Sequence, residues 1–348
     1  MRTLLSRLVS VSLSALRRPE VLPVVPALLL LLASCASSGS SPDAGNIPGN
    51  VDYRAEMRVF VMDIAAYARS TNPGFLVVPQ NGQELYTDTG EASGVPETAY
   101  LEAIDGTGRE SMFYGYYRDD EKTPAEDGEH LRSLCALGEG YGVEVLATDY
   151  CSTHAKMDDA YALNAPEGFI SFAASDRNLA TIPAYPAPIR DNNPDAVESL
   201  ADAKNFLYII NGEHYPDAAS FVSAVDATNY DVIVMDLYQN ESAFSATQIA
   251  ALRTKPSGAR RLVLCYMSIG EAETYRYYWK ASWKPGSPSW LEPENPDWAG
   301  NYKVRYWDPA WQAIITGNDS SYLKRILDAG FDGVYLDIVD GFEYFEER

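Results

Sequence analysis

The stretch GFDGVYLDIVDG, residues 330–341, is an apolar run of β-branched and aromatic residues that contains a carboxylate, Asp337. A run of this length and composition, bounded by glycines, predicts a buried β-strand. A carboxylate buried in such a strand costs free energy unless it has a partner or a chemical role. The stretch therefore predicts a buried strand whose end carries a functional carboxylate.

Seven further segments have the same character, because each is an apolar or β-branched run that ends in polar residues or glycine. They are FLVVPQNG (75–82), YLEAIDGTGRE (100–110), VEVLATDYC (143–151), GFISFAASD (168–176), FLYIING (206–212), DVIVMDLYQN (231–240) and RLVLCYMSIGE (261–271). The segments 54–70, 126–142 and 321–330 have apolar residues at helical spacing, which predicts a helix in each. Eight strands alternating with helices predict an α/β fold, a (β/α)8 barrel. A doubly wound open sheet is the alternative, although no glycine-rich nucleotide motif follows any strand.

The predicted strand ends carry a ring of polar side chains that is rich in carboxylates. They are Gln80, Asn81, Arg109, Glu110, Asp149, Asp176, Asp236, Gln239, Ser268, Glu271, Glu273, Asp337 and Asp340. In a barrel, the carboxyl ends of the strands hold the active site. Charges also gather at strand ends simply because strands stop at solvent. That simpler interpretation is weakest for Asp337, which lies inside an apolar run.

Composition excludes several classes of protein. The chain has 348 residues, a formal net charge of −22 and 46% hydrophobic residues. This charge argues against a nucleic-acid binder, which needs a basic face, and the apolar content excludes a disordered chain. The three histidines lack metal-ligand spacing and the G-x-S-x-G motif is absent, so no metal or cofactor is predicted. Cys151 and Cys265 lie at strand ends and are interpreted as buried small residues.

The first 35 residues are predicted to be an export signal. Four arginines precede an apolar run at 21–32, which ends in Leu-Ala-Ser-Cys at Cys35 and resembles a bacterial lipobox. Cys35 is then the lipidation site, and the small polar residues 36–50 are a flexible tether. This predicts an exported protein of the bacterial cell envelope that contacts the membrane only through its lipid anchor. An ordinary secretory signal with an incidental cysteine is the alternative.

Three long motifs resemble the TIM barrels of glycoside hydrolase family 114, in the branch named endo-α-1,4-polygalactosaminidases. They are LVLCYMSIGEAETYRYYW (262–279), PDWAGNYKVRYWDPAWQAII (296–315) and AGFDGVYLDIVDGFEYFEER (329–348). In that family the last motif ends the fourth strand, and segments like residues 54–176 follow it. The resemblance therefore implies one permuted barrel over 51–348, with strand order 5-6-7-8-1-2-3-4.

On this interpretation, residues 51–176 correspond to the C-terminal half of the family and residues 206–348 to its N-terminal half. Residues 177–205, which are rich in proline and asparagine, form the linker between the old ends. A barrel tolerates such a rearrangement because its ring of strands has no unique starting point. Two half-length pieces joined by a gene-model error are the alternative.

The resemblance also implies hydrolysis of a glycosidic bond by a retaining, two-carboxylate mechanism. Asp337 matches the family's nucleophile and Glu110 its acid/base, with Glu102 on the same segment as the alternative. Side chains predicted to bind substrate complete the site: Asp236, Glu271, Glu273, Asn81, Asp149, Asp340, Tyr238 and Tyr266. For Glu273, an ion pair with Arg276 is an equal alternative, and for each aromatic residue so is core packing.

The substrate implied by the resemblance is an α-1,4-linked galactosamine-type polysaccharide, cut internally. A ring of carboxylates would favour a cationic amino-sugar polymer by charge complementarity. The alternative is a non-catalytic carbohydrate-binding lipoprotein on the same barrel, since a fold alone does not imply activity.

Overall fold

The computed structural model describes residues 51–348. The predicted signal at 1–35, with its lipidation site Cys35, and the predicted tether at 36–50 lie outside the described residues. Within residues 51–348, no helix combines the length and the apolar character needed to cross a membrane.

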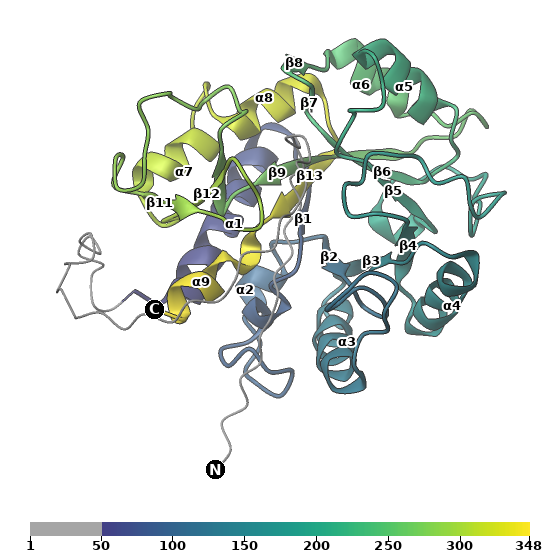
Figure 1. Cartoon of the computed structure of the whole chain (residues 1–348), viewed down its shortest axis with the longest axis horizontal. Helices are drawn as coiled ribbons and strands as arrows, with labels where there is room; N and C mark the ends of the chain where they lie inside the picture. The colour runs from purple at the N-terminus through teal and green to yellow at the C-terminus, as the bar shows by residue number, and fades with distance from the viewer. Residues whose placement is uncertain (1–50) are drawn as a thin grey trace, which may run out of the picture.

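Eight parallel strands form two sheets, so the predicted α/β class is confirmed (Figure 1). In order across the first sheet the strands are β1 (Leu76–Pro79), β13 (Gly333–Asp337), β9 (Leu262–Ser268), β6 (Val232–Asp236) and β5 (Phe206–Tyr208). The second sheet contains β2 (Gly106–Glu110), β3 (Glu144–Tyr150) and β4 (Ile170–Ala174). Every neighbouring pair in both sheets is parallel.

The two sheets adjoin at both edges. At the first edge, the main-chain N–H of Asn81, just after β1, donates to the carbonyl of Gly108 in β2 at 2.8 Å. At the second edge, the rings of Phe172 in β4 and Phe206 in β5 lie 5.4 Å apart between centroids. The parallel strands therefore follow one another in chain order from β1 through β6, β9 and β13, and β13 pairs with β1.

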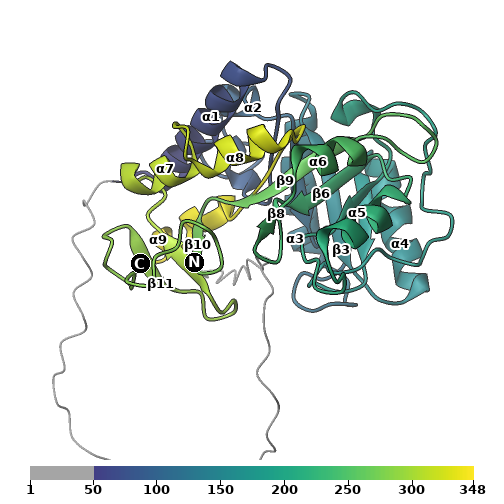
Figure 2. The same cartoon turned by 90° about the horizontal axis from the view of Figure 1, so that it is seen from above.

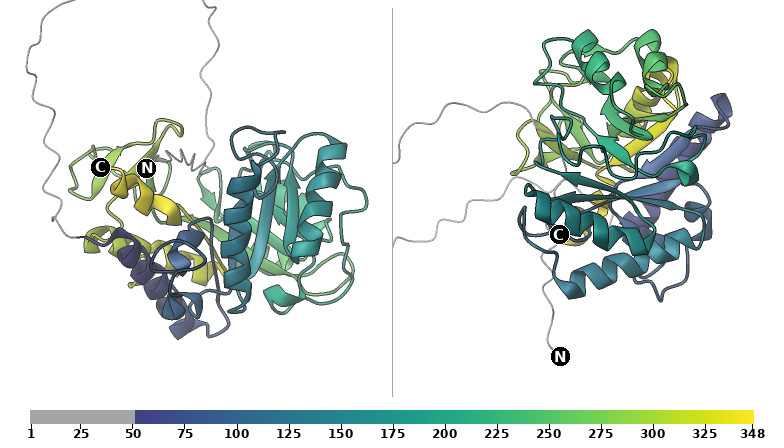
Figure 3. Two further views of the ribbon diagram at one scale, coloured as in Figure 1. Left: turned by 90° about the horizontal axis from the view of Figure 1, so that it is seen from below. Right: turned by 90° about the vertical axis from the view of Figure 1, so that its right-hand side faces the viewer.

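Helices lie outside the sheets. Helices α3 and α4 contact the outer side of the second sheet, and α1, α7 and α8 gather near the first sheet (Figures 2 and 3). The α-helices are α1 (Tyr53–Thr71), α2 (Thr98–Leu101), α3 (Ala125–Glu139), α4 (His154–Asn164), α5 (Ala218–Asp226), α6 (Ala246–Leu252), α7 (Pro309–Ile315), α8 (Tyr322–Ala329) and α9 (Phe342–Glu346). The single-turn helices are η1 (Gln83–Tyr86), η2 (Ala165–Glu167), η3 (Leu200–Asp202) and η4 (Val339–Gly341).

The periodic segments fold as predicted, because their apolar residues recur at helical spacing. In α1 the Asp52 side chain caps the first turn by accepting from the Ala55 N–H at 2.9 Å. Its buried face then includes Phe60, Val61 and Ile64, which are 0% exposed. The predicted helices at 54–70, 126–142 and 321–330 thus correspond to α1, α3 and α8, each within three residues at either end.

One predicted strand is wrong over half its length. The segment 100–110 was expected to be extended, but its first two residues belong to helix α2 and its strand, β2, begins only at Gly106. Tyr100 and Leu101 of this helix are buried in the core, and the Glu102 N–H donates to the Thr98 carbonyl at 2.9 Å. Local burial of a single helical turn therefore overrides the extended pattern. Glu102 ends this helix and is exposed, not mid-strand.

Two of the predicted strands also end earlier than expected. The segment 261–271 divides into β9 and β10 (Glu271–Glu273), which pairs antiparallel with β12 (Asn301–Val304). Strand β11 (Leu291–Glu294) completes this small sheet, and β7 (Tyr238–Gln239) pairs with β8 (Ser242–Ala243) after β6. The sheet β10-β12-β11 follows the carboxyl end of β9 and was not predicted.

We expect Gly108→Ala to destabilise the protein, because Gly108 lies directly against Tyr335. An added Cβ would lie 1.8 Å from the Tyr335 hydroxyl, and Tyr335 is 0% exposed. Overpacking of this kind lowers the free energy of unfolding by about 1–3 kcal/mol, which urea denaturation measures. Gly74→Ala is the matched control, because the nearest atom would be 3.9 Å away. Equal effects of the two substitutions would contradict the close approach.

Candidate active site

Asp337 and Glu110 end two strands that flank β1. Asp337 is the last residue of β13 and Glu110 the last of β2. Both side chains are buried, with 1% and 4% exposure. The two carboxylates are near enough that the charge of Glu110 acts on Asp337. The fold therefore brings together residues 227 positions apart in the sequence.

The surroundings of Asp337 favour its protonated form. Burial is the largest cause and raises the pKa of Asp337 well above its ordinary value, and the charges of Glu110 and Asp340 raise it further. The Tyr266 hydroxyl opposes this by donating a hydrogen bond to Asp337 Oδ2 at 2.5 Å. Asp337 therefore binds a proton more readily than an ordinary aspartate does.

Glu110 is held at both carboxylate oxygens. The Asn81 amide donates to Oε2 at 3.0 Å, and the Tyr150 hydroxyl donates to Oε1. The main-chain N–H of Glu110 donates in return to Asn81 Oδ1 at 3.2 Å. Two neighbouring strand ends, those of β1 and β3, therefore fix the orientation of the Glu110 carboxylate.

Arg109 bonds the main chain beside Glu110. Its guanidinium donates to the main-chain carbonyl of Glu110 at 3.0 Å and to Gln83 Oε1 at 3.1 Å. Successive side chains of a strand point to opposite faces, so Arg109 and Glu110 diverge. The donors that reach the carboxylate oxygens of Glu110 are instead the neutral Asn81 and Tyr150.

Two buried tyrosines lie within reach of both carboxylates, and the sequence analysis missed them. The rings of Tyr208 in β5 and Tyr335 in β13 are 5.1 Å apart, and the Tyr208 hydroxyl donates to Gln80 Oε1 at 2.6 Å. Burial first, then the charges of Glu110 and Asp337 among others, raise the pKa of both tyrosines. Tyr335 was detectable in principle, since it lies two residues before Asp337 and shares its face of the strand.

A second cluster consists of Asp236, Glu273 and Arg276. The Arg276 guanidinium donates to both oxygens of Asp236 at 2.8 and 2.7 Å, and to Glu273 at 2.5 Å. The structure thus contains the Glu273–Arg276 ion pair that was the alternative for Glu273. Burial, then the charges of Asp337 and Glu273, raise the pKa of Tyr266, so this tyrosine lies between the two clusters.

Glu271 and Asp149 have partners within the protein. Glu271 is 0% exposed and accepts from Asn295 at 2.8 Å, and Asn301 and Lys303 also donate to it. Asp149 is 0% exposed too, and three donors surround it: the N–H groups of Phe113 and Tyr114 and the Asn164 amide. Burial raises the pKa of Asp149 to about 6 even so.

Asp340 and Glu343 form an acidic pair beside the carboxylates. Asp340 is 8% exposed, and burial raises its pKa to about 7, with the Lys303 charge opposing and the Glu110 charge adding. Burial and the Asp340 charge raise the pKa of Glu343 to about 9. This pair extends the acidic site along the chain beyond β13.

The structure thus brings Asp337, Glu110, Asn81, Tyr266 and Asp340 into one site. Asp236 and Glu273 lie in the adjoining cluster, and the Tyr238 N–H donates to Asp236 Oδ1 at 2.7 Å. The Tyr238 ring lies 6.4 Å from that of Tyr277.

Residues 51–348 hold no group of three or more histidine, cysteine or acidic side chains arranged to bind a metal ion. Cys151 and Cys265 are free and buried, as predicted.

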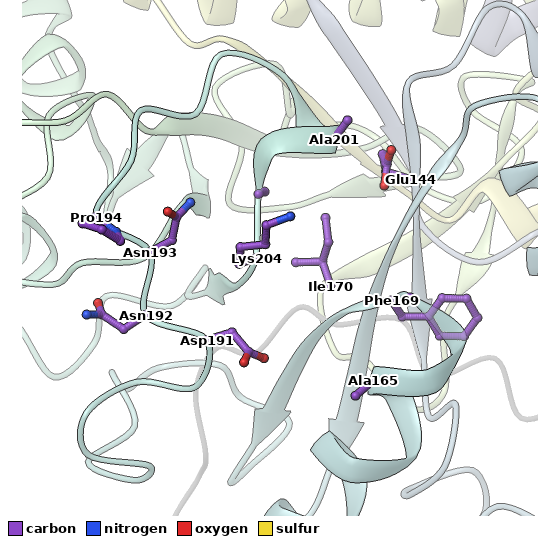
Figure 4. Close-up of a pocket in the computed structure, with 12 residues that line it drawn as sticks. Glu144, Ala165, Phe169, Ile170, Asp191, Asn192, Asn193, Pro194, Ala201 and Lys204 are labelled. Carbon is purple, nitrogen blue, oxygen red and sulfur yellow. The ribbon is translucent and has the colours of Figure 1, made fainter.

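A pocket of about 450 Å³ lies at the opposite ends of the strands (Figure 4). It is lined by Glu144 and Ile170, the first residues of β3 and β4, and by Lys204 and residues 191–194 of the segment that precedes β5. The amino ends of the strands form this pocket, whereas the carboxylate pair lies at the carboxyl ends. The two sites are therefore separate.

The pKa values of Asp340 and Glu343 predict that stability falls as pH rises. In the unfolded chain the pKa values of Asp340 and Glu343 are 3.8 and 4.5. In the folded protein they are about 7 and about 9. Their favourable contribution is fully present below the unfolded values and is lost as pH rises through the folded ones. Asp340→Asn should flatten the decline in unfolding free energy between about pH 4 and 7, and Glu343→Gln should flatten it between about pH 5 and 9.

Urea denaturation at several pH values measures this slope. Glu102→Gln is the control, because Glu102 is exposed and lies outside the site. A decline as steep in both site variants as in the control would contradict the predicted linkage.

Three uncharacterized proteins are similar to part of this chain. Uncharacterized proteins of Deinococcus radiodurans and Methanocaldococcus jannaschii are 39% and 41% identical to it over 127 and 130 residues, each covering 36% of this chain. These segments span 39% and 35% of the two relatives, so the chain matches little more than a third of their length. An uncharacterized protein of Thermotoga maritima is 49% identical over 85 residues, which are 24% of this chain and 25% of that one.

The family model of glycoside-hydrolase family GH114 matches residues 188–348, which include β5, β6, β9, β13 and Asp337. The resemblance noted in the sequence is confirmed over this region, and GH114 is a family of TIM-barrel type. Residues 188–348 of the chain are therefore similar to glycoside-hydrolase family GH114.

Proposed function

We propose that this protein is a glycoside hydrolase that cuts its substrate with Asp337 and Glu110. The observation that carries the proposal is the burial of these two carboxylates at the carboxyl ends of the two strands that flank β1, each with its own hydrogen-bond donors. A pair of carboxylic groups is what glycosidic hydrolysis requires, one to protonate the leaving oxygen and one to attack or to activate water. The match of residues 188–348 to the GH114 family model supports the same chemistry.

The proposed mechanism is retaining. Asp337 attacks the anomeric carbon and forms a glycosyl-enzyme bond, while Glu110 donates its proton to the leaving oxygen. Glu110 then removes a proton from water, which attacks the same carbon and releases Asp337. Tyr266 donates to the Asp337 carboxylate throughout and so orients it for attack.

The protonation of the pair follows from its burial. Desolvation, then the charge of Glu110, raise the pKa of Asp337 and so favour its protonated form. The transition state carries positive charge on the sugar ring, which favours an ionised Asp337 beneath it. The first step needs an ionised Asp337 and a proton on Glu110.

The proposed substrate is an α-1,4-linked galactosamine-type polysaccharide, cut internally. The sequence resemblance to the polygalactosaminidase branch supports this substrate, and the net charge of −22 would favour a cationic polymer. We further propose that a lipid on Cys35 anchors the protein in the bacterial cell envelope, and that residues 36–50 tether it.

We also propose that the chain is a circularly permuted (β/α)8 barrel. The parallel strands follow one another in chain order around both sheets, and the GH114 match is confined to residues 188–348. Residues 51–176 would supply the other half of the ring. The two ends of the described chain lie side by side, because Arg54 in α1 pairs with Glu346 in α9 at 2.9 Å. A short connection could therefore restore the family order.

We expect Asp337→Asn and Glu110→Gln each to abolish most of the hydrolysis of α-1,4-linked galactosamine polymer by residues 51–348. Loss of either carboxylate should reduce kcat by about 10²–10⁴-fold or more, measured by the appearance of reducing ends. Glu102→Gln is the control and should keep full activity. NMR of the first-formed product should show the α-anomer if the reaction is retaining.

The competing function is carbohydrate binding without cleavage. Polymer binding that is equal in the wild type and both carboxylate variants, with no new reducing ends, would favour it.

The permutation predicts that a relinked chain folds. A short Gly/Ser linker would join Arg348 to Val51, and new ends would open between residues 187 and 188. This chain should keep the circular dichroism spectrum and cooperative unfolding of the original, because the cut falls outside the strands of both sheets. A second relinked chain opened inside β9, after Cys265, should not fold. Failure of the first chain to fold would contradict the permutation.

A further inference from the structure

The cation Arg177 lies behind Glu110, and the side chain of Tyr150 separates the two. Tyr150, the last residue of β3, is 0% exposed and donates its hydroxyl to Glu110. The guanidinium of Arg177 lies over the face of the Tyr150 ring, 4.0 Å from the ring centroid. Arg177, Tyr150 and Glu110 therefore form a continuous chain of contacts that ends at the proposed acid/base.

Arg177 is held in this position from the far side. Its Nε donates to Asp119 at 2.5 Å, and its Nη2 donates to the carbonyl of Gly115. Gly115 has a φ of +107°, and an added Cβ would lie 2.8 Å from the Cβ of Tyr150 and 3.1 Å from Arg177. Only glycine permits this backbone to pass so close to both side chains.

The segment that carries these contacts is bonded to β3 as well. The Tyr150 N–H donates to the Tyr114 carbonyl, and the Asp120 N–H donates to the Tyr150 carbonyl, both at 3.0 Å. Tyr150 is thus fixed at its main chain by this loop and at its ring by Arg177. Such bracing restricts the ring, and with it the direction in which the hydroxyl donates.

The electrostatic effect of Arg177 has a definite sign. Burial raises the pKa of Tyr150 well above its ordinary value and the charge of Glu110 adds to this, whereas Arg177 opposes both. A cation over the ring withdraws electron density from the phenol and makes its hydroxyl a stronger donor. A stronger donor stabilises the ionised form of Glu110.

We propose that Arg177 is a positioning residue that acts through Tyr150: it braces and polarises the phenol, and so determines how readily Glu110 gives up its proton. The catalytic part of this proposal rests on the proposed function, in which Glu110 is the acid/base.

Other groups also face Glu110. They are Tyr208 from β5, Tyr335 and Asp337 from β13, Asp340 from η4, and Arg109 at its main chain. The cations named here are Arg109 and Arg177. Of these two, Arg177 is the one that lies over the ring of a donor to the Glu110 carboxylate.

Four variants of residues 51–348 test the proposal. Tyr150→Phe removes the donor, Arg177→Met removes the cation, Arg177→Lys restores a cation without the planar guanidinium, and the fourth combines Tyr150→Phe with Arg177→Met. The Glu110 carboxyl is followed across pH by ¹³C NMR of glutamate-labelled protein, assigned with Glu110→Gln. The pH profile of kcat is recorded on the same samples with the galactosamine polymer.

We expect Glu110 to titrate at higher pH in Tyr150→Phe and, to a smaller extent, in Arg177→Met, with Arg177→Lys between Arg177→Met and the wild type. The alkaline limb of the kcat profile should move in the same direction. The double variant should titrate like Tyr150→Phe alone, because Arg177 acts only through Tyr150. Arg190→Met is the matched control, since Arg190 lies over another ring, that of Tyr161, at 5.9 Å.

A wild-type titration of Glu110 in Arg177→Met would overturn the proposal, and so would a further shift when Arg177→Met is added to Tyr150→Phe. The NMR measurement does not depend on activity, so it separates this inference from the proposed function. A wild-type protein that shows the expected shifts but releases no reducing ends would refute the function and retain the Arg177–Tyr150–Glu110 coupling.

Discussion

Two carboxylates buried close together at strand ends repel each other unless protons or hydrogen-bond donors compensate them. In this protein the compensation is local. Tyr266 donates to Asp337, while Asn81 and Tyr150 donate to Glu110. These donors come from β9, from the turn after β1 and from β3, so the site requires those strands to keep their relative positions. The packing of strands around Asp337 and Glu110 meets this requirement.

The seam between β1, β2 and β13 is where that requirement is strictest. The Tyr335 hydroxyl lies against Gly108, so no larger side chain fits between β2 and β13 at this level. Asn81, with a φ of +58°, turns its amide to Glu110 at the same seam. Packing and chemistry thus depend on the same few contacts, because the strand ends that form the seam also carry the carboxylates.

The remaining acids divide into two kinds. Asp236, Glu273, Glu271 and Asp149 are matched by donors or cations of the protein itself, and these contacts hold loops at the carboxyl ends of the strands. Asp340 is buried among groups of its own sign, with Lys303 opposing. A net charge of −22 is therefore not a uniform acidic surface. Most of the predicted ring stabilises the site, and a smaller part of it lies beside the reacting pair.

The sequence by itself determined the eight apolar strands, the helices between most of them and the carboxylate in VYLDIV, because periodicity and composition are local properties. It also carried the GH114 resemblance over residues 188–348. Only the tertiary structure decided that Asp149 and Glu271 bond inside the protein, that residues 98–101 form a helix, and that Tyr150, Tyr208 and Tyr335 surround the carboxylates. Those outcomes depend on contacts between segments far apart in the chain, whose geometry no local pattern encodes.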